Sequence, residues 1–179
     1  TIARHQSRIV RVRVASNRTM AIDSEGRPPK SYEAIVANGA DAAIARVLWE
    51  YQPAGIGSYG NQTVRHVDSQ GTPQTLKFSR PVEKELEVEL TYTVYPEEEF
   101  PGVAELKRVV TEWAVGEYSL GKDVIPGRLQ GAAYKVPGID TVTARVRWSG
   151  SGTWLTTHLP VTTREYAYLA EENITVVLA

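Results

Sequence analysis

The sequence predicts an α+β protein of two small subdomains, each a mostly antiparallel sheet with helices packed on one face. Two observations predict this class: several segments alternate apolar and polar residues with a period of two, and others repeat apolar residues at helical spacing. A third, the Arg80-Pro81 pair, separates the two groups and sets the expected boundary. At 179 residues and 42% hydrophobic content, the chain has room for two such subdomains.

The first subdomain, residues 1–81, is expected to run β-β-α-β-β. A strand over 8–15 alternates valines with Arg11 and Arg13, which indicates a half-buried strand with its valines inward. A turn at 23–28 leads to a second short strand at 32–37.

A helix is expected over 41–51, with Asp41 as its N-terminal cap. Strands at 63–68 and 74–79 form a hairpin around residues 68–73, whose Asp-Ser-x-Gly-x-Pro sequence repeats that of the earlier turn. The helix carries one apolar stripe that predicts its buried side: Ile44, Val47, Leu48 and Tyr51.

The second subdomain, residues 82–179, is expected to run β-α-α-β-β-β. Its clearest strand, 86–94, has one apolar face and one acidic face. A helix at 103–115 and a shorter one after Pro126 follow. The remaining expected elements are strands at 141–148, 154–158 and 174–178.

The composition excludes several classes of function. There is no cysteine, and hence no disulfide, thiolate zinc site, iron–sulfur cluster or cysteine nucleophile. The sequence contains no run of about 18 apolar residues, so no membrane span is expected. The net charge of −1 gives no general attraction to nucleic acid or to anionic lipid.

Charge is unevenly distributed along the chain. Residues 1–30 hold seven basic and two acidic groups, whereas residues 83–105 hold eight glutamates and one lysine. Two interpretations stay open: solvated strand faces, or complementary faces that set the register between subunits, with repulsion among the glutamates relieved on assembly. The candidate interface residues are Arg11, Arg13, Tyr59, Glu85, Glu87, Glu89 and Trp154.

No catalytic, cofactor or metal site is expected. His5, His66 and His158 lie far apart, without partners at metal-ligand spacing. Residues 55–60 match the dinucleotide pattern G-x-G-x-x-G, but they follow a helix and precede a strand, the reverse of the order that holds pyrophosphate.

The carboxylates also lack a catalytic arrangement. Nothing near the Asp23/Glu25 pair or the run Glu97–Glu99 would separate their pKa values, as an acid–base mechanism requires. We expect them to be turn and loop residues.

An ordered series of segments resembles the baseplate J-like family, wedge proteins of contractile phage tails. No segment is specific alone; their order and spacing carry the resemblance, which covers about residues 8–179. The segments are Gly26–Val36, Ile44-Ala45, Trp49, Pro53–Ile56, Tyr59–Asn61, Asp68–Gly71, Phe78–Pro81 and Val136–Ile139 with the strand after it.

The resemblance implies a virion structural protein of the tail baseplate, assembled in the host cytoplasm. Its partners would be further copies of itself and other wedge or hub subunits, and it would help to transmit the signal for sheath contraction. A surface or secreted binding module without catalytic activity is the alternative, and an enzyme with a dispersed site is a weaker one. The matching residues would be architectural: Gly55, Gly60, Gly71, Phe78, Arg80, Pro81, Pro137 and Gly138.

Overall fold

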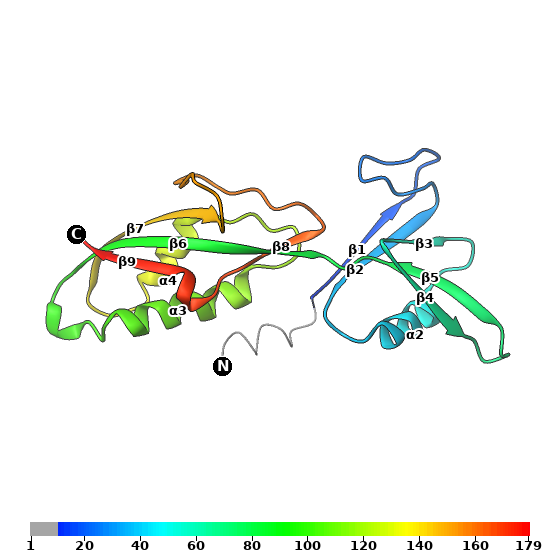
Figure 1. Ribbon diagram of the computed structural model, residues 1–179, viewed down its shortest axis with the longest axis horizontal. Coiled ribbons are helices and arrows are strands. Elements are labelled where there is room, and N and C mark those ends of the chain that lie inside the picture. Colours follow the sequence, from blue (N-terminus) through cyan, green and yellow to red (C-terminus); the bar gives the residue numbers. More distant parts are fainter. Residues whose placement is uncertain (1–10) are drawn as a thin grey trace. The chain divides into compact units, whose positions relative to one another are not determined.

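The computed structural model describes residues 11–179, and its contacts divide them between Pro81 and Val82 into two compact units. We call 11–81 the N-terminal unit and 82–179 the C-terminal unit. Each combines strands with helices, which confirms the predicted α+β class with two subdomains (Figure 1).

The N-terminal unit contains a three-stranded sheet and a separate hairpin. In the sheet, β2 lies between β1, which is antiparallel to it, and the short β3, which is parallel. The hairpin strands β4 and β5 pair with each other and pack against the helix α2. The elements are β1 (Arg11–Asn17), β2 (Ser31–Ala37), α2 (Asp41–Tyr51), β3 (Gly57–Tyr59), β4 (Gln62–Val67) and β5 (Pro73–Phe78).

Phe78 is the centre of a small core in this unit. It is fully buried, and Ala34 and Val36 of β2 pack with it. Ile44 and Leu48 of α2 cover these residues from the helix side. The helix therefore lies over β2 rather than over β1.

Two predictions about α2 are wrong. Val47 and Tyr51 were expected in its buried stripe but are 47% and 79% exposed, because the helix reaches only part of the sheet. Asp41 was expected as the N-terminal cap, but Ala40 holds that position without a side-chain hydrogen bond. The Asp41 carboxylate instead pairs with Arg80.

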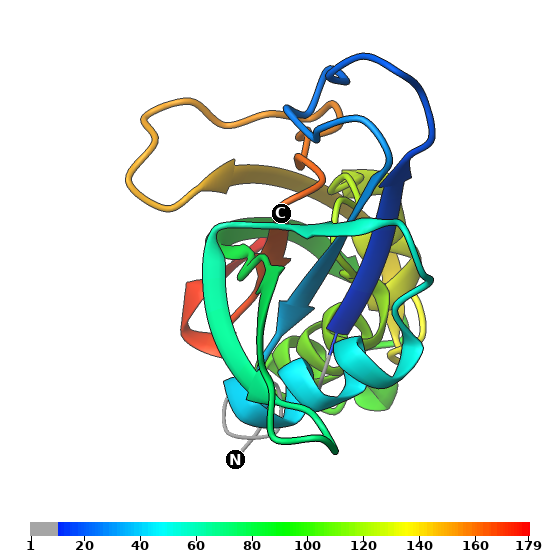
Figure 2. The same cartoon turned by 90° about the vertical axis from the view of Figure 1, so that its right-hand side faces the viewer.

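The repeated Asp-Ser-x-Gly-x-Pro turns adopt the same structure. In each, one aspartate oxygen accepts two backbone N–H groups, a local bond pattern that favours aspartate at such turns. Gly26 and Gly71 occupy the left-handed position, with φ of 80° and 79°. The bonds are those of Asp23 with Glu25 and Arg27, at 3.0 and 2.9 Å, and those of Asp68 with Gln70 and Thr72, both at 2.9 Å. The loop that contains the first turn extends beyond the β1–β2 hairpin (Figure 2).

A long strand, β6, forms the centre of the C-terminal unit. It pairs antiparallel with β7 on one side and parallel with both β8 and β9 on the other. This sheet is therefore mixed, and the prediction of a mostly antiparallel sheet does not hold here. The elements are β6 (Val82–Val94), α3 (Val103–Glu117), α4 (Pro126–Ala133), β7 (Ile139–Trp148), β8 (Glu165–Tyr168) and β9 (Ile174–Leu178), with 3-10 turns η1 (Glu97–Glu99) and η2 (Glu171–Asn173).

The apolar face of β6 makes the larger core. Leu86, Val88 and Leu90 are fully buried, in agreement with the period-two pattern. They pack against α3 and α4, which lie on one face of the sheet (Figure 1). Burial of each such side chain is worth about 1.5–3 kcal/mol.

The expected strand at 154–158 is not formed. Leu155 makes a single bridge to Val146, and the segment otherwise runs as an irregular loop. No helix of the described chain is long and apolar enough to cross a membrane.

Candidate interaction surface

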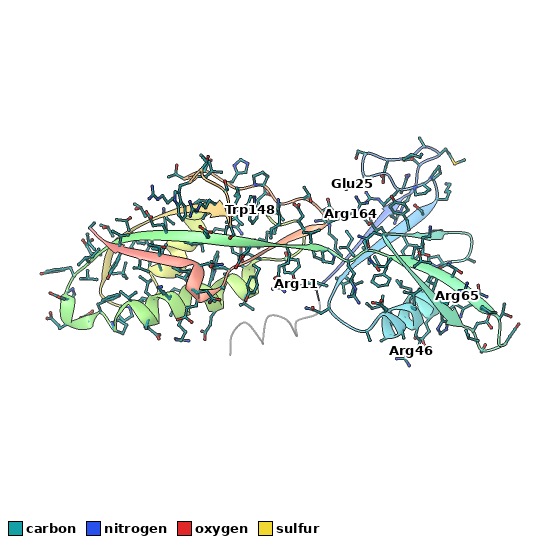
Figure 3. All side chains as sticks on the ribbon, viewed as in Figure 1. Arg11, Glu25, Arg46, Arg65, Trp148 and Arg164 are labelled. Carbon is teal, nitrogen blue, oxygen red and sulfur yellow. The ribbon has the colours of Figure 1, made fainter. Side chains whose placement is uncertain are left out.

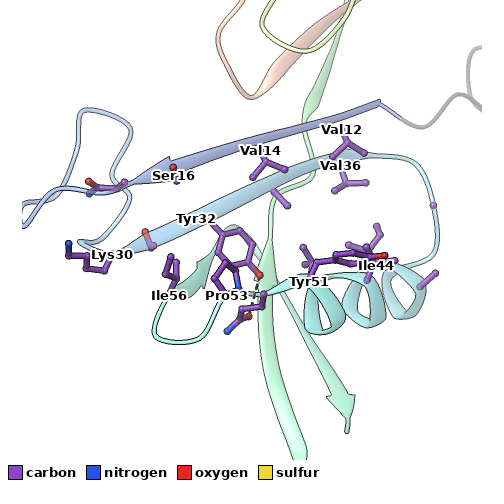
Figure 4. Close-up of a pocket in the computed structure, with 18 of the residues that line it drawn as sticks. Val12, Val14, Ser16, Lys30, Tyr32, Val36, Ile44, Tyr51, Pro53 and Ile56 are labelled. Carbon is purple, nitrogen blue, oxygen red and sulfur yellow. Dashed lines mark hydrogen bonds between the residues drawn. The ribbon is translucent and has the colours of Figure 1, made fainter. Parts of the chain in front are cut away.

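An apolar groove lies between the β1–β2 hairpin and α2 (Figure 4). The register of the hairpin places Val12 opposite Val36 and Val14 opposite Ala34, so these side chains share the face that looks toward the helix. The groove has a volume of about 950 Å³. Its apolar lining includes Val12, Val14, Tyr32, Ala34, Val36, Ile44, Val47, Leu48, Tyr51, Pro53 and Ile56.

The groove is open because α2 covers β2 but leaves β1 bare. Val12 and Val14, which the strand pattern predicted to be inward, are 58% and 64% exposed. With Val47 and Tyr51 they form one apolar surface rather than scattered side chains. A contiguous apolar patch of this kind marks an interaction site in a folded protein.

One end of the groove is cationic. Arg18 and Lys30 line it, and the lining includes no carboxylate. Neither cation forms an ion pair with any residue in 11–179, although Lys30 Nζ donates to the Arg18 carbonyl at 3.4 Å. An occupant with an apolar part and a negative end would match this surface.

The wall beside α2 is fixed by a side-chain hydrogen bond. The Tyr32 hydroxyl of β2 donates to Oε1 of Gln52, the residue after α2, at 3.2 Å (Figure 4). Partial burial raises the pKa of Tyr32 above its ordinary value.

Arg80 holds the turn that leads from β2 into α2. This turn contains two successive left-handed residues, Asn38 and Gly39, with φ of 66° and 83°. The guanidinium also lies 5.0 Å from the centre of the Phe78 ring. Its hydrogen bonds go to the carbonyls of Val36 (3.0 Å), Asn38 (2.6 Å) and Gly39 (2.6 Å) and to Asp41 Oδ1 (2.5 Å). The side chain, expected at the junction of the halves, thus supports the end of the groove.

A buried glutamate joins β2 to the end of β5. Glu33 is fully buried; it accepts a hydrogen bond from Ser79 Oγ at 2.5 Å and one from Arg27 Nη1 at 3.3 Å. A buried carboxylate needs such partners. Sequence reasoning missed Glu33, because an isolated glutamate within a strand pattern reads as a solvent-facing residue.

The acidic face of β6 is partly neutralised within the C-terminal unit. Arg147 Nε lies 2.6 Å from Glu87, and Arg145 Nε lies 2.6 Å from Glu89. The hydrogen bond from Arg147 lowers the pKa of Glu87 below its ordinary value. The idea that repulsion among these glutamates is relieved by assembly therefore needs correction, since arginines of β7 already pair with two of them.

The other predicted interface residues of this unit also have internal partners. Glu85 accepts a hydrogen bond from Asn173 Nδ2 at 2.8 Å. The Trp154 ring lies 5.2 Å from the Arg145 guanidinium and 4.3 Å from that of Arg147, and it holds the loop after β7 over the sheet. The loop that carries Trp154 begins after Trp148, the last residue of β7 (Figure 3).

The three predicted interface residues of the N-terminal unit lie away from the groove. Arg11 and Arg13 lie on the face of β1 opposite to the groove, as their register with Ala37 and Ile35 requires. Tyr59 is half-buried in β3. None of the three lines the groove.

Two of the singled-out glycines allow close approach of backbone segments. A Cβ at Gly60 would lie 2.1 Å from the carbonyl carbon of Phe78, and one at Gly138 would lie 2.7 Å from the Phe100 nitrogen. Gly55 and Gly71 have open space but φ of 79°. Pro137 precedes the Gly138 turn into β7, and Pro81 ends the N-terminal unit.

The histidines do not form a centre. His66 lies against Trp49, with ring centres 6.2 Å apart, and His158 is exposed in the loop after β7. His5 lies outside the described residues. Residues 11–179 contain no group of three histidine or carboxylate side chains placed to hold a metal ion.

The G-x-G-x-x-G residues 55–60 and the acidic run Glu97–Glu99 lie in the positions that their sequence context predicted. Residues 55–60 follow α2 and include β3. Asp23 belongs to its turn, and Glu97–Glu99 form the exposed 3-10 turn η1.

In comparison with known proteins, the chain matches no family model and no curated protein.

Proposed function

We propose that this chain is a non-catalytic structural subunit of a contractile phage tail baseplate, which joins wedges around the central hub and supports sheath-contraction signalling. It would work through contacts with further copies of itself and with other wedge or hub subunits.

Two kinds of evidence support the proposal. The ordered series of segments described above resembles the baseplate J-like family and supplies the phage context. The single structural observation that favours assembly is the groove, whose exposed Val12, Val14 and Tyr51 make an apolar surface that a partner would bury. Burial of apolar area is the main favourable contribution to protein association.

Localisation tests the proposal. The organism that encodes the chain is engineered to carry a small epitope tag in the exposed loop around Ser69, and released particles are labelled with gold-conjugated antibody. Gold at the baseplate end of contractile tails is expected. Intact tails that carry no label, while the tagged chain is present in the same lysate, would contradict the proposal.

The alternative is a non-viral surface or secreted binding module. The same groove favours it, because Tyr32 and Tyr51 both contribute to the lining and aromatic side chains commonly contact ligands. The tagged strain discriminates the two functions: label on the cell surface or in the particle-free medium would support a binding module.

A further inference from the structure

We propose that the groove of the N-terminal unit receives the loop Tyr95–Glu99 from the C-terminal unit of a second copy of the chain. This inference rests on the proposed function, in which copies assemble, and it names the surfaces that meet.

The loop offers what the groove lacks. Tyr95 is 78% exposed and is followed closely by three exposed carboxylates, Glu97–Glu99. Within the described chain, none of these carboxylates forms an ion pair. An apolar ring beside unpaired negative charge is complementary to an apolar groove with unpaired Arg18 and Lys30 at its end.

Both ends of the loop are tied to the C-terminal unit by backbone hydrogen bonds and a ring contact. Tyr95 N donates to the Gly138 carbonyl at 2.8 Å, and Phe100 N donates to the Glu97 carbonyl at 3.1 Å. The Phe100 ring packs against Tyr92, with centres 5.4 Å apart. A loop fixed in this way loses little conformational freedom on binding.

The loop is shorter than the groove wall along which it would lie. From Val14 to Arg18 the groove wall spans about 13 Å, taken as four residues of extended chain. From Tyr95 to Glu98 the loop spans less than about 10 Å, because Glu97–Glu99 form the 3-10 turn η1, which rises only about 2 Å per residue. When the Tyr95 ring lies near Val14, the long side chains of Arg18 and Lys30 and of the loop glutamates close the remaining distance between the opposite charges.

The charges of the two units favour this pairing over pairing of like units. The N-terminal unit has nine basic and six acidic residues, whereas the C-terminal unit has nine basic and fifteen acidic residues. Most arginines that have a carboxylate next to them already form an ion pair within their own unit, as Arg145 and Arg147 do with glutamates of β6. A groove-to-loop contact joins two different surfaces, so copies can exchange loops reciprocally in a closed dimer or repeat the contact into a ring or an open chain.

Cysteine cross-linking tests the contact, since the chain has no native cysteine. A chain carrying Ser16→Cys in the groove is mixed with a differently sized chain carrying Glu98→Cys, and both are oxidised. Cross-linked heterodimer is expected to form at least about tenfold faster than with Ser69→Cys, a control on an exposed turn, because the docked thiols share a high effective concentration. Equal rates for Ser16→Cys and Ser69→Cys would overturn the proposal.

Charge reversal provides an independent test by sedimentation at low ionic strength. Arg18→Glu with Lys30→Glu is expected to weaken self-association by about tenfold, and a mixture with the Glu97→Lys, Glu98→Lys chain is expected to restore it. Arg46→Glu with Arg65→Glu makes the same change in net charge at exposed residues outside the groove and should leave association unchanged. Equal weakening by that control, no restoration, or a monomeric chain at every concentration would overturn the docking. Gold label at the baseplate would still support the proposed function in that case, so the two failures are distinguishable.

Discussion

Replacement of Arg80 by alanine is expected to lower the stability of the N-terminal unit by about 2–5 kcal/mol. The Val36 carbonyl is buried, and a hydrogen bond from a charged donor to such a group is worth about 1.5–3 kcal/mol. The exposed pair with Asp41 adds about 0–1 kcal/mol, and the contact with the Phe78 ring adds about 0.5–1 kcal/mol. The carbonyls of Asn38 and Gly39 are near solvent, so water replaces their lost donor.

Hydrogen-exchange mass spectrometry is the suitable assay, because it reports each unit separately. Faster exchange is expected through 31–51, with the C-terminal unit unchanged. Arg80→Lys keeps the charge but not the planar fork, and should recover less than half of the loss. Arg65→Ala, on an exposed arginine of β4 (Figure 3), is the matched control. A loss for Arg80→Ala within about 0.5 kcal/mol of that control would refute the reasoning.

Three further predictions concern stability. Gly60→Ala should lower the stability of the N-terminal unit by about 2–4 kcal/mol, because the new Cβ meets the Phe78 backbone, while Gly57→Ala has open space and should be tolerated; thermal unfolding compares them. Thr111→Val should raise the stability of the C-terminal unit by about 1 kcal/mol in denaturant titration, since its buried hydroxyl has no partner within the described chain; a loss would contradict this. The side-chain amide of Gln74, and then backbone N–H groups, lower the pKa of Asp68, so its stabilising effect should be full above about pH 4 and disappear as pH falls through the lowered value. Asp68→Asn should flatten this acid limb, and an unchanged limb would refute the assignment.

Local patterns predicted most helices and strands. The alternation along 86–94 and the apolar spacing of 103–115 lie within β6 and α3, because burial of one face fixes both period and position. The short strands β3 and β8 were missed. Each is only three or four residues long and owes its existence to a longer strand beside it.

The groove was not predicted, for a physical reason. The same apolar spacing places Val47 and Tyr51 on one side of α2 whether or not a sheet covers them. Likewise the valines of β1 alternate correctly but face a region that α2 does not reach. Sequence periodicity gives the direction of a side chain, while coverage depends on the tertiary arrangement.

Electron microscopy of tails assembled with a groove variant tests whether a partner buries the groove in the baseplate. Tyr51→Glu places a charge on a side chain that is 79% exposed, so the fold should tolerate it, and Val67→Glu makes the same change at an exposed site outside the groove. We expect complete baseplates to fall at least about tenfold for Tyr51→Glu, equivalent to about 1.4 kcal/mol of contact energy, at an unchanged amount of chain. Normal baseplate numbers with Tyr51→Glu would contradict this expectation.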